Sequence, residues 1–347
     1  MAPIRNARAY YAAVPTEYIE PDVHVKYDDS RTIDLDTVKL NGGFLLKTLC
    51  LSVDPYMRGK MRDPKIKSYT PPFEFNQSLY GYGLGKVIRS EDEAYKPGDV
   101  VHGMVFHEEY SVYNGPLTPF VPFHKLENIG LPWSVYTGVL GMPGQTAYYG
   151  WKAYSKAKAG ETAFVSTAAG AVGSLVVQLA KRDGLRVIAS SGSDDKVAYA
   201  KECGADVSFN YKTEKVWDVL EREEKGLDIY FDNVGGDHLD AALASANRFG
   251  RVLMCGMASQ YNGQQPYVLK NLGQAIGKVI TLQGLLYNVL RPQFQDEFFA
   301  TIPQLVKDGT IKYREDVTNG LQTVGQALND VGSGKNFGKR VVVVAED

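Results

Sequence analysis

The sequence is poor in cysteine and nearly balanced in charge, and each shortage excludes a class of protein. Its 3 cysteines, Cys50, Cys203 and Cys255, lie far apart in a chain of 347 residues, so they supply neither a disulfide framework nor a CxxC metal clamp. They indicate reduced thiols and a cytoplasmic protein. The formal net charge of −2 gives no electrostatic reason to expect nucleic acid or an anionic membrane as a partner.

Long apolar runs are also missing. No segment approaches the roughly 20 apolar residues of a membrane helix, and no uninterrupted apolar stretch near the N-terminus suggests a signal peptide. We therefore expect no membrane partner. The composition, 44% hydrophobic and 22% charged, is ordinary for a globular protein, and the length suffices for two domains.

The first third of the chain alternates short apolar segments with turns. Phe44–Val53 is apolar and bounded by turns, Gly83–Arg89 runs toward another turn, and Val100–Phe106 resumes the pattern. Several short strands of this kind predict a small, partly open β-barrel. Lys339–Val344 reads as one more strand, which we expect to rejoin this first domain.

From Gly141 onward, strands alternate with helices, which indicates an α/β fold with a doubly wound parallel sheet of the Rossmann type. The predicted strands are Ala163–Thr167, Arg186–Ser190, Asp228–Asn233, Arg251–Gly256 and Thr281–Gly284. The predicted helices are Ala171–Asp183, Asp194–Cys203, Asp237–Ala246 and Pro292–Asp308.

A glycine turn follows the first strand of this sheet and opens a helix. It reads AxGxxG, with Ala168 in the place of the first glycine of the usual fingerprint. Gly170 lets the backbone approach a pyrophosphate, and Gly173 permits close packing of helix and strand. With Ala171 and Val172, these glycines form a helix N-terminus that favours phosphate. The pattern predicts dinucleotide binding; the alternative is a tight turn without a ligand.

The end of the second strand predicts the choice of cofactor. An enzyme that uses NADH usually has an acidic residue there, but this chain has Ser190–Ser193. These small residues, Gly192 among them, leave room for a 2′-phosphate, and Lys196 can pair with it. Asp194 and Asp195 suit the first turn of a helix, where the dipole favours acids. Although Lys196 could also be a surface lysine, the segment favours NADPH.

Six segments together resemble the motifs of one family. In order they are Leu51–Gly59, Met142–Tyr148, the AAGAVG turn, Asp232–Gly236, Cys255–Asn262 and Lys335–Lys339. The chain resembles the zinc-independent medium-chain dehydrogenases/reductases, and among them the alkenal double-bond reductases, a group that includes prostaglandin reductases and leukotriene hydroxydehydrogenases. The resemblance covers nearly the whole chain.

The resemblance implies a GroES-like barrel domain of residues 1–135 and 310–347 around a Rossmann domain of residues 136–309. It also implies a homodimer that uses NADPH to reduce the C=C bond of α,β-unsaturated aldehydes and ketones. By matching motifs, it places further residues at the cofactor: Lys196, Tyr211, Asn233, Cys255, Gly256, Ser259, Tyr261, Leu285, Leu286, Tyr287 and Asn336. At Leu285–Tyr287 relatives read Phe-Ile/Val-Val, and this departure puts the substrate preference in doubt.

The residues also argue against a catalytic metal. Zinc-dependent relatives carry a GHE motif where this chain has Gly81-Tyr82-Gly83, so tyrosine replaces the ligand and glycine replaces the acid. His102 and His107 are close in sequence but have no cysteine or acidic partner at the spacing that tetrahedral zinc requires. We therefore expect no metal.

Without zinc, hydrogen-bond donors must stabilise the enolate that forms when hydride reaches the β-carbon. Tyr261 is the first candidate because it follows the carboxyl end of a strand, where such sheets bind ligands. Tyr56 and Tyr82 are the next candidates. Each tyrosine could instead be only a pocket wall, and the cofactor ribose hydroxyl could stabilise the enolate. Two other functions stay open, an NADPH quinone reductase of the same superfamily and a non-catalytic, crystallin-like NADPH-binding protein.

Overall fold

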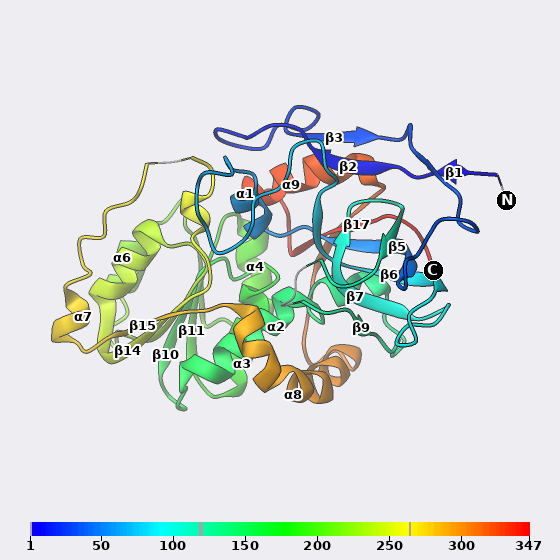
Figure 1. Cartoon of the computed structure of the whole chain (residues 1–347). Coiled ribbons are helices and arrows are strands. Elements are labelled where there is room, and N and C mark those ends of the chain that lie inside the picture. The colour runs from blue at the N-terminus through cyan, green and yellow to red at the C-terminus, as the bar shows by residue number, and fades with distance from the viewer. Residues whose placement is uncertain (1, 118–120, 264) are drawn as a thin grey trace. The chain divides into compact units, whose positions relative to one another are not determined.

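The computed structural model of the chain describes residues 2–117, 121–263 and 265–347 (Figure 1). The chain divides into two compact units. Unit 1 comprises residues 1–138 and 315–347, and unit 2 comprises residues 139–314.

Unit 2 contains a six-stranded sheet with the strand order β12-β11-β10-β13-β14-β15, and every neighbouring pair is parallel. Its strands are β10 (Thr162–Val165), β11 (Arg186–Ser191), β12 (Val207–Asn210), β13 (Leu227–Asp232), β14 (Ala246–Met254) and β15 (Thr281–Gly284). This is the doubly wound Rossmann order, which reverses between β10 and β13. The prediction of the α/β Rossmann class is confirmed.

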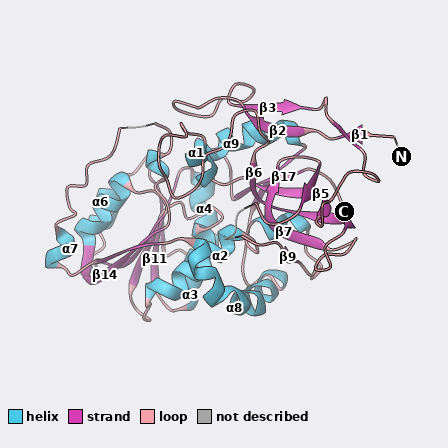
Figure 2. Cartoon of the chain, in the orientation of Figure 1, coloured by secondary structure: helices cyan, strands magenta, loops and turns pink. Residues whose placement is uncertain are grey.

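Helices accompany the strands of unit 2 (Figure 2). They are α2 (Met142–Gly150), α3 (Gly173–Arg182), α4 (Asp194–Glu202), α5 (Val216–Glu221), α6 (Gly236–Ser245), α7 (Gln274–Gly277) and α8 (Tyr287–Lys307), with a π-helical turn at Trp151–Ser155 and a 3₁₀ turn at Ala258–Gln260. The central strands β10 and β13 are largely buried, as is usual where both faces of a parallel sheet are covered. Phe164, for example, is fully buried in one cluster with Val219 of α5 and Leu243 of α6.

Three of the predicted helices begin elsewhere, α6 by a single residue at Gly236 and two by more. Helix α3 starts at Gly173 rather than Ala171, because the two preceding residues belong to the glycine turn. Helix α8 starts at Tyr287, so Pro292 lies inside it rather than at its first position. The proline removes one hydrogen bond of the helix. The first turn of α8 is packed, since the Tyr287 ring stacks on Tyr149 at 5.8 Å between centroids.

Unit 1 contains a seven-stranded sheet with the path β16-β17-β5-β6-β7-β9, and β8 pairs with β5. The strands are β5 (Phe44–Ser52), β6 (Tyr80–Ser90), β7 (Val100–Phe106), β8 (Tyr110–Tyr113), β9 (His124–Lys125), β16 (Glu315–Asn319) and β17 (Lys339–Val343). Two small sheets pair β1 (Ile4–Arg5) with β4 (Thr32–Ile33) and β2 (Arg8–Tyr11) with β3 (Val25–Asp28). The helices are α1 (Tyr56–Lys60) and α9 (Val324–Gly332), with 3₁₀ turns at Trp133–Thr137 and Leu321–Thr323.

Strand β17 joins the first part of the chain, as predicted, because it pairs antiparallel with β5. A buried ion pair reinforces this pairing. The Lys339 ammonium donates to the Val53 carbonyl at 2.7 Å and to Asp54 at 3.2 Å, and both charged side chains are 4% exposed. Ser52 donates to the other oxygen of Asp54 at 2.6 Å. Burial lowers the pKa of Lys339, and Asp54 opposes that shift.

We predict that Lys339→Met lowers the free energy of unfolding by about 3–5 kcal/mol, because it leaves the Asp54 charge buried without its partner. Urea denaturation of the full chain measures the change. The control is Lys86→Met, which removes an exposed pair with Asp347 and should change the free energy by less than about 1 kcal/mol. Equal effects of the two substitutions would contradict the role of the buried pair.

Candidate functional site

The turn between β10 and α3 presents free backbone amides at the start of a helix. The Gly170 amide donates to the Thr167 carbonyl at 2.9 Å, which tightens the turn. Within the described part of the chain, the next three amides, of Ala171, Val172 and Gly173, donate no backbone or side-chain hydrogen bond, and no side chain caps α3. Amides so placed bind phosphate groups readily.

Gly173 has a steric reason to be glycine. A Cβ at this position would overlap the carbonyl oxygen of Thr167 and lie 2.9 Å from the Cα of Ala168. The helix therefore approaches the turn more closely than any side chain permits, which is the close packing that the sequence predicted.

The turn after β13 is tied to the turn after β10. The backbone amide of Asn233 donates to the Ser166 hydroxyl at 2.9 Å, and its side-chain amide donates to the Ser166 carbonyl at 2.8 Å. These two strand ends lie where the strand order reverses, and such sheets bind ligands at this point. Asn233 is thus held beside the glycine turn.

The segment 255–261 is bonded to the same turn. The amides of Cys255 and Gly256 donate to the Asp232 carbonyl at 2.8 and 3.0 Å. The Ser259 hydroxyl donates to the Val234 carbonyl at 2.7 Å. Burial, aided by the Asp232 charge, raises the pKa of the Cys255 thiol to about 12, so the thiol stays protonated.

The side chain of Asp232 shapes this turn, although no separate role was predicted for it. Its carboxylate is fully buried and accepts from the Tyr230 hydroxyl at 2.7 Å and from the amides of Val234 and Gly235 at 2.9 and 2.7 Å. Burial raises its pKa, and these hydrogen bonds oppose the shift. The sequence did contain a signal for this residue, because Asp232 is the first residue of the DNVGG segment.

Tyr261 lies over its own segment. The Met257 amide donates to the Tyr261 hydroxyl at 3.0 Å, and a Cβ at Gly256 would lie 3.2 Å from that hydroxyl and 3.1 Å from the Asn233 carbonyl. Tyr261, Gly256 and Asn233 therefore converge at the carboxyl ends of β13 and β14.

The serines at the end of β11 fit a polar ligand. The hydroxyls of Ser190 and Ser191 are buried and have no hydrogen-bond partner within the described residues. A Cβ at Gly192 would lie 2.8 Å from the Tyr211 hydroxyl, so glycine is needed for Tyr211 to approach. Lys196 lies in the first turn of α4, which begins directly after this segment. The predicted 2′-phosphate residues therefore share one strand end.

The remaining predicted cofactor residues lie in different surroundings. The Leu285 amide donates to the Met254 carbonyl at 3.0 Å, which places it beside the end of β14, and Leu286 is exposed. Tyr287 is buried, and its hydroxyl donates to Gln145 at 3.2 Å. Asn336 belongs to unit 1, where its side chain donates to the Gly338 carbonyl at 2.9 Å.

Within unit 1 the structure brings two of the predicted tyrosines together. The rings of Tyr56, at the start of α1, and Tyr82, in β6, meet edge to face at 6.0 Å between centroids. Tyr82 also stacks on His102 at 6.1 Å. Burial raises the pKa of Tyr56 well above the ordinary value of a phenol, so its hydroxyl stays protonated at neutral pH.

Two residues near Tyr56 were missed or given no role. Lys60 ends α1 with its ammonium over the rings of Tyr80 and Phe73, at 3.7 and 4.7 Å from their centroids, and burial lowers its pKa to about 7. His107 is fully buried, which lowers its pKa to about 3. From the sequence, His107 was considered only as a zinc ligand. No periodic pattern of apolar residues indicated that Lys60 is buried.

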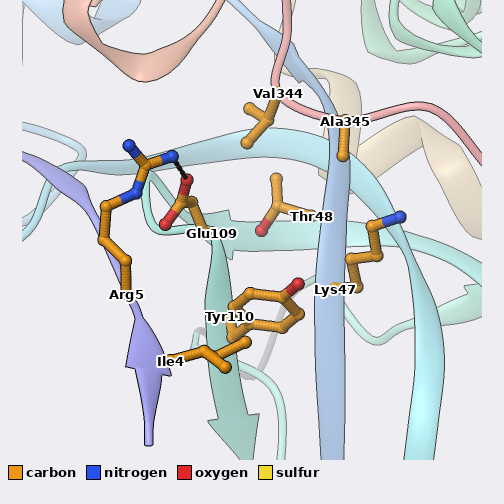
Figure 3. Close-up of a pocket in the computed structure, with 8 residues that line it drawn as sticks. All are labelled: Ile4, Arg5, Lys47, Thr48, Glu109, Tyr110, Val344 and Ala345. Atoms are coloured by element: carbon orange, nitrogen blue, oxygen red, sulfur yellow. Dashed lines mark hydrogen bonds and ion pairs between the residues drawn. The ribbon is translucent and has the colours of Figure 1, made fainter. Parts of the chain in front are cut away.

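Unit 1 also has a surface groove apart from these tyrosines (Figure 3). An ion pair between Arg5 and Glu109, 2.6 Å long, lies in it. Its lining consists of Ile4, Arg5, Lys47, Thr48, Glu109, Tyr110, Val344 and Ala345. None of these is a predicted site residue.

Neither a metal cluster nor a membrane helix occurs in the described ranges. Among residues 2–117, 121–263 and 265–347, no group of three or more His, Cys, Asp or Glu side chains is placed to hold a metal ion. In the same ranges, no helix has both the length and the hydropathy needed to cross a membrane.

Comparison with known proteins decides the family. Residues 23–119 match the family described as the N-terminal domain of oxidoreductase, and residues 171–306 match the family described as zinc-binding dehydrogenase. The NADP-dependent 2-alkenal reductase of Nicotiana tabacum is 43% identical over 94% of both chains. The chain belongs to the zinc-independent alkenal reductases of the medium-chain dehydrogenase/reductase family. The family prediction is confirmed.

Two further relatives of this alkenal reductase extend the comparison. A zinc-type alcohol dehydrogenase-like protein of Schizosaccharomyces pombe is 42% identical over 92% of both chains. The crystal structure of CurA from Vibrio vulnificus in complex with NADPH is 31% identical, with a TM-score of 0.88 over 98% of this chain and 100% of that one.

We predict that Lys196→Ala raises the Michaelis constant for NADPH about tenfold or more and leaves that for NADH nearly unchanged. The reason is that only NADPH has the 2′-phosphate, and a hydrogen bond to a charged group contributes about 1.5–3 kcal/mol. Steady-state kinetics with both cofactors test this, with Lys201→Ala in the last turn of the same helix as control. Equal effects of Lys196→Ala on both cofactors would contradict the assignment of Lys196 to the 2′-phosphate.

Proposed function

We propose that this alkenal reductase uses NADPH to reduce the C=C bond of α,β-unsaturated aldehydes and ketones. The observation that carries the proposal is the 43% identity to a 2-alkenal reductase over nearly the whole chain. The site agrees with it, because the free amides at the start of α3 and the unpartnered serine hydroxyls at the end of β11 suit a phosphorylated dinucleotide.

The cofactor is NADPH, and when bound it supplies the hydride that reaches the β-carbon of the substrate. The chain's own residues hold and orient the two reactants, which by itself accounts for a large part of a rate enhancement. The amides of Ala171, Val172 and Gly173 bind the pyrophosphate, and Ser190, Ser191 and Lys196 receive the 2′-phosphate. Asn233, fixed by Ser166, borders the same site.

Tyrosine hydroxyls are the candidate donors to the developing enolate oxygen, Tyr261 in unit 2 and Tyr56 and Tyr82 in unit 1. The Tyr261 hydroxyl accepts the Met257 amide at 3.0 Å, which orients the phenol at the carboxyl ends of β13 and β14. Tyr56 and Tyr82 offer a second pair of phenols, and Tyr56 stays protonated because burial raises its pKa. We assign Tyr261 the first catalytic role and the other two tyrosines supporting ones.

We further propose that the reductase is a cytoplasmic homodimer. Strand β15 is the last strand on its side of the unit 2 sheet, and residues near it are apolar and exposed, Ile276 at 86% and Val279 at 48%. An open strand edge favours pairing with a second copy, and such pairing would cover the exposed apolar side chains of α7 and of the turn before β15. The three free cysteines suit a reducing compartment. Light scattering of the full chain, which gives its molar mass, tests the dimer.

A substrate panel tests the activity. NADPH oxidation is followed with 2-alkenals, enones, quinones and simple ketones, and each product is identified by mass spectrometry. The proposal expects a saturated C=C bond with an intact carbonyl. Turnover of quinones without saturation of alkenals would favour a quinone reductase, and NADPH binding without turnover would favour a non-catalytic protein.

We predict that Tyr261→Phe lowers kcat for a 2-alkenal about 100-fold and changes the Michaelis constant for NADPH little. A donor aimed at developing negative charge acts mainly in the transition state, and its loss costs about this much. Tyr18→Phe, at an exposed tyrosine, is the control. An unchanged kcat, with the chemical step shown to limit the rate, would assign the donor elsewhere.

A further inference from the structure

Three side chains of unit 1 face one point over Gly81. Gly81 lies in β6 opposite Val105 of β7. A Cβ built on Gly81 would lie 3.4 Å from the Tyr56 hydroxyl oxygen, 3.4 Å from the Met57 sulfur and 3.5 Å from Nε2 of His107. These are ordinary van der Waals distances, so the space over Gly81 has the size of one small group.

Both polar atoms at this point are buried and need a partner. The Tyr56 oxygen and both ring nitrogens of His107 make no hydrogen bond within the part of the chain that the structure describes. The backbone of Tyr82 is close enough to the Tyr56 hydroxyl to oppose the rise of its pKa, but it does not meet the geometry of a full hydrogen bond. Buried polar atoms in folded proteins are nearly always hydrogen-bonded, to protein or to ordered water. His107, fully buried, therefore points to a ligand.

The geometry suits a single oxygen atom. A water oxygen cannot occupy the Cβ position itself, which is one bond length from the Gly81 Cα. A bridging water would lie farther from that Cα, between the two polar atoms and about 3 Å from each, the length of a normal hydrogen bond. Buried waters bind where two to four polar groups converge, and the Met57 sulfur adds a weak acceptor. Because burial lowers the pKa of His107 to about 3, its ring is neutral at physiological pH and has a nitrogen that accepts.

We propose that one buried water molecule binds over Gly81 and bridges Tyr56 to His107. The water donates one hydrogen to the Tyr56 oxygen and the other to Nε2 of His107. The phenolic hydrogen of Tyr56 is then directed away from the water and toward the substrate oxygen. His107 is a positioning residue, because it acts only through the water and Tyr56. This last step, unlike the water site itself, rests on the proposed function.

Gly81 can be replaced by alanine without a steric clash. Gly81→Ala places a methyl group at contact distance from all three side chains, and Gly81 lies in a strand without a positive φ. The variant should fold normally, yet the methyl group leaves no room for the water beside the Gly81 backbone. Gly59→Ala is the matched control, since a Cβ at Gly59 meets no atom within 4 Å.

The kinetic expectation separates positioning from folding. Gly81→Ala should lower kcat for a 2-alkenal about tenfold, leave the Michaelis constant for NADPH within twofold and leave the melting temperature near that of the wild type. Gly59→Ala should leave kcat within twofold. A kcat of Gly81→Ala equal to that of the control overturns the positioning role.

A double-mutant cycle tests whether His107 acts through the same water. His107→Phe keeps a ring of similar shape and removes both nitrogens, and it should lower kcat by a similar factor. Combining it with Gly81→Ala should cause no further loss, because residues that share one partner are not additive. Multiplicative losses would show that the two positions act separately and would overturn the bridge.

A crystal structure of the wild-type chain supplies a readout that needs no activity. Electron density for one water within about 3.2 Å of both atoms supports the inference, and its loss in Gly81→Ala completes the test. The absence of such density in the wild type overturns the inference even if alkenals are reduced. Density without alkenal reduction instead leaves the water site standing and refutes the proposed function.

Discussion

The ion pair between Lys339 and Asp54 is the contact on which the organisation of unit 1 depends. It joins residues from opposite ends of the sequence inside the protein, where an unpaired charge is very unfavourable. Asp54 lies between the end of β5 and the start of α1, so the pair fixes both β17 and the backbone that leads into Tyr56. The geometry around Tyr56 thus rests on a contact made by the last strand of the chain.

In unit 2 the corresponding role belongs to hydrogen bonds between strand ends, some of them made by side chains. Asn233 bonds to Ser166, and the amides of Cys255 and Gly256 bond to Asp232. The turns after β10, β13 and β14 therefore form one connected edge of the sheet. A parallel sheet gathers its carboxyl ends at one edge, and here the hydrogen bonds fix the loops that leave them.

Local rules of the sequence predicted the parts of the fold that local physics decides. Val100–Phe106 was predicted with the bounds observed, because turns limit a buried strand on both sides, and Gly173 was predicted for the packing that it makes. Helix α8 was placed too late at Pro292, because the packing of Tyr287 against Tyr149 is not visible in a pattern. Strand β12 was not predicted, since Val207–Asn210 is short and only Phe209 is buried.

Motifs in the sequence pointed to residues of the candidate site, but they did not indicate which of those residues touch one another. Tyr56 and Tyr82 were both predicted from the sequence, but the contact between their rings was not. His107 was considered only as a zinc ligand, because a histidine in a strand carries no sign of which atoms will face it. The long-range pairing of β6 with β7 brings it to Gly81, and no sequence spacing encodes that approach.

The alternating glycines of β6 give this strand an uneven tolerance to change. A Cβ at Gly83 would lie 2.5 Å from Val105 and 2.8 Å from the Cys50 carbonyl, and one at Gly85 would overlap the Lys47 carbonyl. A Cβ at Gly81 meets only side chains at contact distance. Among these three glycines, only Gly81 can therefore take a side chain without a clash with the backbone, which makes it the position from which directed evolution could reshape the surroundings of Tyr56.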